Sequence, residues 1–306
     1  MVDYEAVIIG GGPAGLAAGI YLARAKRRVV LLGEKIFDGP VANLESVENY
    51  PGYAEPVSGA QLIGEMINQA LKYDLPLEQT TVKGMEPGTD GYRITCADGK
   101  TLTARVLIIA SGTSHRKLGV PGEALLQGKG VFSCALCDGG KFKDKPIAVC
   151  GSGDAGATEA IYMTKLASKV ILFEVLPAVS TTGILKERLL SNSKIEVHCN
   201  TKVQTILGTD HVEGVKVTDP AGKETIVRVS GVLVHIGLVP NTGFLNNMLP
   251  LDGTGHIIVN GNMASRIPGI FAAGDVRSGS PNQIITAAGD GATAAITAEK
   301  LLQQHP

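Results

Sequence analysis

Two cysteines near the middle of the chain have the clearest potential for chemistry. Cys134 and Cys137 lie in the stretch GVFSCALCDGGKF, separated by two residues, and Asp138 follows directly. A Cys-x-x-Cys pair can supply half of a zinc site, close a small structural disulfide or act as a redox-active dithiol. A carboxyl group beside it can exchange protons with a thiol. The pair alone does not decide between these chemistries, so the surrounding sequence elements have to.

Two glycine-rich segments have a spacing that could bind phosphate groups. Each follows a short apolar run that predicts a buried parallel strand, and each precedes an alanine-rich run that predicts a helix. In such a turn the first glycine permits a tight bend, the second lets a pyrophosphate approach the backbone, and the third lets the helix pack on the strand. The G-x-G-x-x-G positions are Gly10, Gly12 and Gly15 in AVIIGGGPAG, and Gly151, Gly153 and Gly156 in PIAVCGSGDAG.

An acidic residue completes each of these two units. Glu34 and Glu174 each follow the next predicted strand, about 20 residues after the first glycine, where an acid can bind a ribose hydroxyl. Two such units predict an α/β chain with two Rossmann-like, three-layer dinucleotide-binding domains. Two dinucleotide sites imply two dinucleotides, and the usual pair is FAD with a pyridine nucleotide.

Composition argues against several other classes of protein. Lys and Arg total 28 against 29 Asp and Glu, so neither a nucleic acid nor an anionic membrane surface is expected as a partner. Five scattered cysteines do not form the framework of a secreted disulfide-rich protein. The apolar segment at 6–23 is interrupted by three glycines and Pro13, which indicates a strand, turn and helix rather than a membrane span. We therefore expect a cytoplasmic protein.

The order of motifs along the chain resembles one known family. GGGPAG, VENYPG, IIASGT, CALCDG, GSGDAG and GIFAAGDVRSG together are similar to the motifs of the low-molecular-weight thioredoxin reductases, which are flavin disulfide reductases. The resemblance covers nearly the whole chain. It implies an FAD-binding domain made of residues 1–113 and 244–306, with a pyridine-nucleotide-binding domain at 114–243 inserted into it. It also implies a homodimer.

The resemblance assigns most of the binding residues. For FAD it implies Gly10, Gly12, Pro13, Ala14, Gly15, Glu34, Asn49, Val82, Ala110, Gly112, Gly274, Asp275, Gln283 and Ile284. For the nicotinamide nucleotide it implies Gly151, Gly153, Gly156, Glu159 and Glu174.

The resemblance also implies a role for the cysteine pair. Electrons would pass from a nicotinamide through FAD to a Cys134–Cys137 disulfide, and then to a thioredoxin-like or glutaredoxin-like disulfide protein. Cys137 would face the flavin, Cys134 would attack the partner disulfide, and Asp138 would be the acid/base. Asp138 could alternatively cap a helix, because Asp suits that position.

The other interpretations of the pair are less favoured. A zinc site needs further ligands, and the six histidines show no paired spacing, so no metal is predicted. A structural disulfide across two residues would close a very small loop and stabilise little. No chemical role is predicted for His115, expected on the surface, or for the other three cysteines. His235 lies near a glycine-bearing crossover and is given no firm role.

The chain departs from the family in ways that bear on the electron donor. NADPH-using members carry His-Arg-Arg where this chain has FEVLPA at 173–178, and no Arg or Lys occurs between Lys169 and Lys186. Glu174 would accept hydrogen bonds from a ribose 2′-hydroxyl and repel a 2′-phosphate, which favours NADH over NADPH. Asp38-Gly39-Pro40 replaces the usual Gly-Gly-Gln, so contacts to the flavin would differ there.

Three alternative functions remain open at this point. Some relatives accept electrons from ferredoxin or a deazaflavin, although both glycine units are intact here. Dithiol oxidases of the same fold tend to have His after the Cys-x-x-Cys pair, where this chain has Asp138. A non-catalytic flavin-bearing redox sensor is the least favoured alternative.

Overall fold

The computed structural model describes residues 2–44 and 46–304, and the chain divides into two compact units. The outer unit comprises Met1–Ser114 and Val239–Pro306, and the inserted unit comprises His115–Leu238. The chain passes between the units twice. The two passages pair with each other as the short strands β7 (Thr113–His115) and β16 (Leu238–Pro240).

A mixed seven-stranded sheet organises the outer unit. Its order is β3-β2-β1-β6-β5-β4, with β17 pairing β6; β1, β2, β3, β6 and β17 pair in parallel, whereas β4 and β5 are antiparallel. The strands are β1 (Tyr4–Ile9), β2 (Val29–Gly33), β3 (Leu77–Gln79), β4 (Val82–Gly88), β5 (Gly91–Cys96), β6 (Thr101–Ile109) and β17 (Ile270–Ala272). The helices are α1 (Pro13–Arg24), α2 (Gly59–Leu71) and α7 (Ile284–Gln304), with short 3-10 turns η2 (Gly243–Leu245) and η3 (Gly274–Val276).

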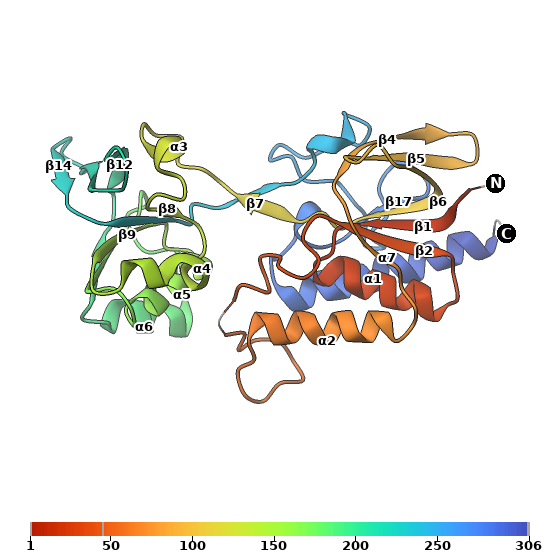
Figure 1. Ribbon diagram of the computed structural model, residues 1–306, viewed down its shortest axis with the longest axis horizontal. Coiled ribbons are helices and arrows are strands. Elements are labelled where there is room, and N and C mark those ends of the chain that lie inside the picture. The colour runs from red at the N-terminus through yellow and green to blue at the C-terminus, as the bar shows by residue number, and fades with distance from the viewer. Residues whose placement is uncertain (1, 45, 305–306) are drawn as a thin grey trace. The chain divides into compact units, whose positions relative to one another are not determined.

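Alternation along β1 and β2 divides the core of the outer unit between two faces of the sheet. Ile8 and Leu31 pack with α1, α2 and α7, whereas Val7 and Val30 pack on the other face with residues of β4 and β5. Figure 1 shows the three helices together on one side of β1 and β2, with the β4–β5 hairpin on the other. β1 is buried on both faces, which explains why its apolar residues form a continuous run rather than alternating with polar ones.

A five-stranded parallel sheet organises the inserted unit. Its order is β11-β10-β9-β15-β8, and a separate antiparallel sheet has the order β12-β13-β14. The parallel strands are β8 (Val131–Phe132), β9 (Pro146–Cys150), β10 (Lys169–Phe173), β11 (Ile195–His198) and β15 (Gly231–Val234). The other elements are α3 (Glu123–Leu126), α4 (Ala135–Asp138), η1 (Gly139–Phe142), α5 (Asp154–Met163), α6 (Gly183–Ser191), β12 (Lys202–Leu207), β13 (Gly214–Thr218) and β14 (Glu224–Val227).

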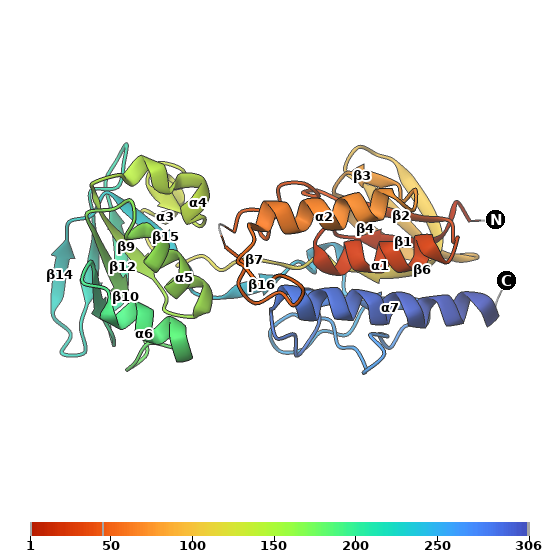
Figure 2. The same ribbon diagram turned by 90° about the horizontal axis from the view of Figure 1, so that it is seen from below.

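The inserted unit also has three layers. Val149 and Leu172 face α5 and α6, whereas Ala148 and Ile171 face the antiparallel sheet. Figure 2 shows α4 beside α5 within this unit. The three-layer α/β arrangement predicted from the two strand–glycine–helix patterns is confirmed. Within the described residues, no helix is both long enough and apolar enough to cross a membrane.

Candidate functional site

The first glycine loop joins β1 to α1, and its three glycines have distinct steric surroundings. Gly10 has φ of 122°, and a Cβ there would lie 2.1 Å from the carbonyl oxygen of Ala110. A Cβ on Gly15 would lie 1.8 Å from the carbonyl oxygen of Gly10. At Gly12 a Cβ would meet no atom within 4 Å, so the space there is open. Two of these glycines thus permit close packing, and the third leaves room beside the backbone.

The second glycine loop joins β9 to α5 and repeats this arrangement. Gly151 has φ of 97°, and a Cβ there would lie 2.0 Å from the carbonyl oxygen of His235. A Cβ on Gly156 would lie 2.4 Å from the carbonyl oxygen of Gly151. A Cβ on Gly153 would meet only Ser180 Oγ, at 4.0 Å. The inserted unit therefore repeats the steric plan of the outer unit.

Both loops leave the start of a helix available to an anion. The N-cap residues are Gly12 for α1 and Gly153 for α5, and neither makes a side-chain cap hydrogen bond. The first N–H groups of a helix have no partner within it, and they commonly bind phosphate oxygens. Open space at the middle glycine and uncapped N–H groups fit a dinucleotide pyrophosphate at each loop.

The two acids that follow the loops differ strongly in environment. Glu34 follows β2 and is exposed. Glu174 follows β10 and is 6% exposed. Its Oε2 accepts hydrogen bonds from the backbone N–H of Ser152, at 3.0 Å, and from the Ser152 hydroxyl, while Oε1 accepts one from the N–H of Leu176 at 3.0 Å. Glu174 is thus tied to its own glycine loop, which the sequence pattern did not reveal.

The predicted flavin residues include one contact between distant segments. The Asn49 side-chain amide donates to Gln283 Oε1 at 2.9 Å across 234 residues. Gly274 lies against Ala14, since a Cβ there would be 3.0 Å from the Ala14 Cβ. Burial raises the pKa of Asp275. The structure therefore gathers residues of the first loop, Gly274 and the start of α7 in one region of the outer unit.

The other predicted residues of the outer unit lie in different surroundings. Ala110 supplies the carbonyl next to Gly10, and Gly112 has φ of 62°. Ile284 begins α7 and packs against a small apolar cluster with Val57. Val82 is buried at the start of β4, where it borders a hollow of about 380 Å³.

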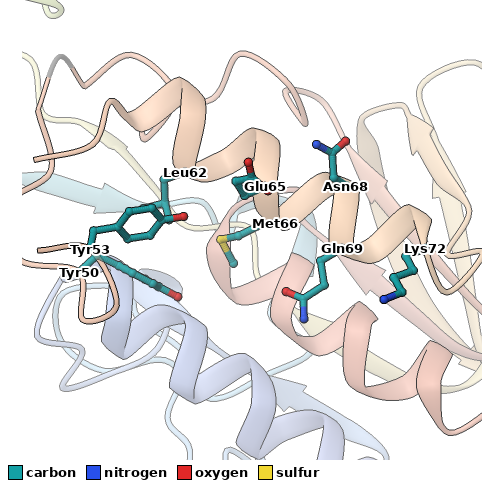
Figure 3. A pocket seen from close by; sticks show the side chains of 8 residues that line it. All are labelled: Tyr50, Tyr53, Leu62, Glu65, Met66, Asn68, Gln69 and Lys72. Atoms are coloured by element: carbon teal, nitrogen blue, oxygen red, sulfur yellow. The ribbon is translucent and has the colours of Figure 1, made fainter. Parts of the chain in front are cut away.

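A second hollow, of about 440 Å³, lies along α2 in the outer unit. Its lining comprises Tyr50, Tyr53, Leu62, Glu65, Met66, Asn68, Gln69 and Lys72 (Figure 3). None of these is a predicted site residue. The hollow is therefore not assigned to either dinucleotide.

The cysteine pair is a disulfide at the surface of the inserted unit. The sulfur atoms of Cys134 and Cys137 are 2.07 Å apart. Cys134 is half-buried and Cys137 is exposed. Cys134 is the N-cap of α4, and its Sγ accepts the N–H of Cys137 at 3.1 Å. Among residues 2–44 and 46–304, no three His, Cys, Asp or Glu side chains gather closely enough to hold a metal ion.

The Asp138 side chain pairs with a lysine and does not bind the backbone N–H groups at the start of a helix. It is the last residue of α4 and makes no side-chain cap hydrogen bond to η1. Its Oδ1 instead accepts from Lys141 Nζ at 2.6 Å. Asp138 thus occupies the N-cap position of η1, as the capping alternative places it, but its side chain makes no cap hydrogen bond there. The carboxylate stays one residue from Cys137 and is charge-paired at the surface.

Glu159, a predicted nicotinamide-binding residue, contacts the start of the redox helix, and sequence reasoning missed this contact. Glu159 of α5 contacts both the N–H of Ala135 and Nε2 of His235 through its Oε2, at 2.9 Å each. The ring of His115 meets the ring of His235 edge to face, with centroids 4.9 Å apart. Desolvation and the nearby His235 lower the pKa of His115. The one sequence signal was the position of His235 at the end of an apolar strand.

Two glycine loops with the spacing typical of dinucleotide-binding sites and a surface Cys-x-x-Cys disulfide fit a nucleotide-dependent disulfide oxidoreductase. Comparison with known proteins agrees. The family described as pyridine nucleotide-disulphide oxidoreductase matches residues 4–291. A thioredoxin reductase of Listeria monocytogenes is 37% identical, covering 98% of this chain and 94% of the relative. The chain therefore belongs to the pyridine nucleotide-disulphide oxidoreductase family and is an FAD-dependent enzyme of the thioredoxin reductase type.

Solved structures give the same result. The thioredoxin reductase of Lactococcus lactis has a TM-score of 0.95 and 34% identity, covering 99% of this chain and 100% of that one. The thioredoxin reductase of T. acidophilum has a TM-score of 0.93 and 34% identity, with the same coverage. The family resemblance and the fold inferred from the sequence motifs are thus confirmed.

Proposed function

We propose that this enzyme passes electrons from NADH, through FAD, to the Cys134–Cys137 disulfide and then to the disulfide of a thioredoxin-like protein. The observation that carries the proposal is the surface disulfide on the inserted unit, which is followed along the chain by η1, β9 and the second glycine loop. A glutaredoxin-like protein is the alternative partner. The proposal includes a cytoplasmic homodimer, and light scattering of the purified protein tests the dimer.

The outer unit is the proposed FAD-binding unit. The first glycine loop would hold the pyrophosphate, the exposed Glu34 would bind the ribose, and the hydrogen-bonded Asn49 and Gln283 would lie beside the flavin. When bound, FAD would supply the two-electron chemistry between nicotinamide and disulfide. The proposed FAD residues are Gly10, Gly12, Pro13, Ala14, Gly15, Glu34, Asn49, Val82, Ala110, Gly112, Gly274, Asp275, Gln283 and Ile284.

The inserted unit is the proposed nicotinamide-binding unit. The second loop would hold the pyrophosphate through Gly151, Gly153 and Gly156. Glu174 accepts three hydrogen bonds from the protein, and an ionised carboxylate has about four acceptor sites, so it retains capacity for a ribose hydroxyl. Glu159 belongs to the same proposed set.

The environment of Glu174 supports NADH over NADPH. The next two side chains, Val175 and Leu176, are 65% and 49% exposed, and both are uncharged. A 2′-phosphate near Glu174 would meet like charge, at a cost on the order of 4 kcal/mol at 4 Å with an effective dielectric of 20. No lysine or arginine between Lys169 and Lys186 would offset that repulsion.

The cysteines would carry out a balanced thiol–disulfide exchange. After reduction, the Cys134 thiolate attacks one sulfur of the partner disulfide, forming a mixed disulfide and releasing the partner's other sulfur as a thiolate. Cys137 then attacks Cys134, which releases the partner dithiol and restores the Cys134–Cys137 bond. Asp138, one residue from Cys137, would hold or deliver the proton that this cysteine exchanges.

A comparison of electron donors tests the proposal. The FAD-loaded protein is mixed anaerobically with NADH, NADPH or reduced ferredoxin, and flavin bleaching and thioredoxin reduction are followed. We expect kcat/KM for NADH to exceed that for NADPH by at least roughly tenfold, which corresponds to about 1.4 kcal/mol. A preference for NADPH contradicts the assignment of Glu174. If only ferredoxin bleaches the flavin, the donor assignment fails while the thiol exchange stands.

A further inference from the structure

A carboxylate on α5 contacts the start of the helix that carries the cysteines. Glu159 Oε2 lies 2.9 Å from the backbone nitrogen of Ala135, the first residue of α4. The same oxygen lies 2.9 Å from Nε2 of His235. The side chains of Glu159 and His235 are only 17% and 5% exposed. The contact is therefore largely shielded from solvent within the inserted unit.

The N–H of Ala135 depends on this carboxylate. A residue in the first turn of a helix has no hydrogen-bond partner for its N–H within that helix. Ala135 is 1% exposed, so solvent has little access to it, and a buried donor needs a protein acceptor. Glu159 supplies that acceptor. The preceding residue is Cys134, so the position of its sulfur depends on a contact made one residue away.

Charged groups approach the redox helix from two sides. At its carboxyl end Asp138 and Lys141 pair with each other at 2.6 Å, which neutralises their charges locally. At its amino end the carboxylate is Glu159, contacted by His235, whose ring meets that of His115. Desolvation and His235 lower the pKa of His115, which keeps that ring neutral over more of the pH range. Glu159 is thus the negative group at the amino end of α4.

We propose that Glu159 and His235 are positioning residues for the redox cysteines: Glu159 fixes the amino end of α4, and its charge, partly shielded by the hydrogen bond with His235, restrains formation of the Cys134 thiolate. A negative charge nearby disfavours ionisation of a thiol. This restraint would keep reduced Cys134 protonated until a partner disulfide is present. The inference rests on the proposed function only in taking Cys134 as the sulfur that reacts with the partner.

The test is the pH dependence of Cys134 alkylation. The full-length, FAD-loaded Cys137→Ser protein cannot form the disulfide, and peptide mass spectrometry follows iodoacetamide labelling of Cys134 alone. Glu159→Gln removes the charge but keeps an oxygen that can accept the Ala135 N–H. We expect this change to lower the midpoint of the alkylation profile by about half to one pH unit and to speed labelling at pH 7 roughly threefold to tenfold.

Two further variants make the result decisive. Glu187→Gln removes an exposed carboxylate on α6 and is expected to leave the profile unchanged. His235→Phe removes the hydrogen bond that shields the Glu159 carboxylate and leaves its charge in place, so the midpoint should rise. Equal midpoints for Glu159→Gln and Glu187→Gln overturn the proposal. If Glu159→Gln does not fold, His235→Phe decides, and an unchanged midpoint overturns it. No nicotinamide is used, so a failed NADH assignment leaves this result interpretable.

Discussion

The two glycine loops share a backbone plan but differ in the acid that follows them. In both, the first and third glycines permit contacts that a Cβ would block, and the middle glycine borders open space. Glu34 of the outer unit is exposed, whereas Glu174 of the inserted unit is buried and hydrogen-bonded to Ser152 and Leu176. The repeated motif therefore specifies the turn, whereas the neighbouring residues determine how many hydrogen bonds the acid makes within the protein.

The largest expected effect comes from filling the third glycine position in each loop. Gly15→Ala places a Cβ 1.8 Å from a carbonyl oxygen, so the purified protein should lack FAD. Gly156→Ala places one at 2.4 Å; it should retain FAD and lose roughly 100-fold in the rate of flavin reduction by NADH, since overpacking costs about 1–3 kcal/mol. Flavin absorbance and stopped-flow reduction measure the two effects.

Gly64→Ala is the matched control for these changes. Gly64 lies inside α2, and a Cβ there would meet nothing within 4 Å. An alanine in a helix is favoured over glycine by about 0.5–1 kcal/mol, so this variant should keep FAD and NADH activity. If Gly156→Ala lost FAD and Gly15→Ala kept it, the assignment of the two dinucleotides would be reversed.

The contrast between the two acids predicts a difference in stability. Glu174→Ala leaves the N–H of Ser152, a residue with 0% exposure, without its acceptor, at a cost of about 1–3 kcal/mol in the free energy of unfolding. Glu34→Ala changes an exposed side chain and should alter that free energy by less than about 0.5 kcal/mol. Urea unfolding followed by circular dichroism compares them. Equal losses in the free energy of unfolding would mean that the hydrogen bonds of Glu174 do not stabilise the protein more than the exposed Glu34 does.

A change of coenzyme preference sharpens the comparison further. Val175→Arg combined with Leu176→Arg adds two cations beside Glu174 at exposed positions. Because an exposed charge-assisted hydrogen bond to a 2′-phosphate contributes about 1.5 kcal/mol, kcat/KM for NADPH should rise roughly tenfold. Ile226→Arg, at an exposed position on β14, adds a cation elsewhere and should leave the NADH-to-NADPH ratio unchanged. An unchanged NADH-to-NADPH ratio in the double variant would indicate that the ribose does not bind beside Glu174.

The sequence predicts features that depend on neighbouring residues better than features that depend on residues far apart in the chain. The strand–glycine–helix units depend on local periodicity and on the sterics of single glycines, so the fold class could be predicted and is confirmed. The family came from the resemblance of the motifs to those of known proteins, and it is confirmed as well. The hydrogen bonds of Glu174 could not be predicted, because they depend on how Ser152 turns in a loop already formed. The Glu159–His235 contact spans 76 residues and needs β15 to pair with β9, which no local pattern specifies.

The smallest expected effect concerns acid stability of the outer unit. Arg27 binds both carboxylate oxygens of Glu299, at 2.7 and 2.9 Å, and joins the turn between α1 and β2 to α7. Its hydrogen bonds lower the pKa of Glu299 below the ordinary 4.5. A lowered carboxyl pKa contributes stability above that ordinary value, and the contribution is lost as the pH falls through the folded-state pKa. Glu299→Gln should cost about 1 kcal/mol at pH 7 and progressively less below pH 4.5.

Urea unfolding at several pH values measures this effect. The free energies of unfolding of Glu299→Gln and wild type should converge as the pH falls. A constant difference across the range would show that the pair does not respond to protonation of Glu299. Gln303→Ala alters a neighbour that donates to Glu299 at 2.9 Å without removing the charge, and serves as the control.

The most direct test of the central claim counts the electrons that the protein takes from NADH. In an anaerobic titration, the FAD-loaded wild type should consume about two equivalents of NADH per chain, one for the flavin and one for the Cys134–Cys137 disulfide. Cys134→Ser should consume about one. Equal uptake by the two proteins would show that NADH electrons do not reach the disulfide, and would contradict the account.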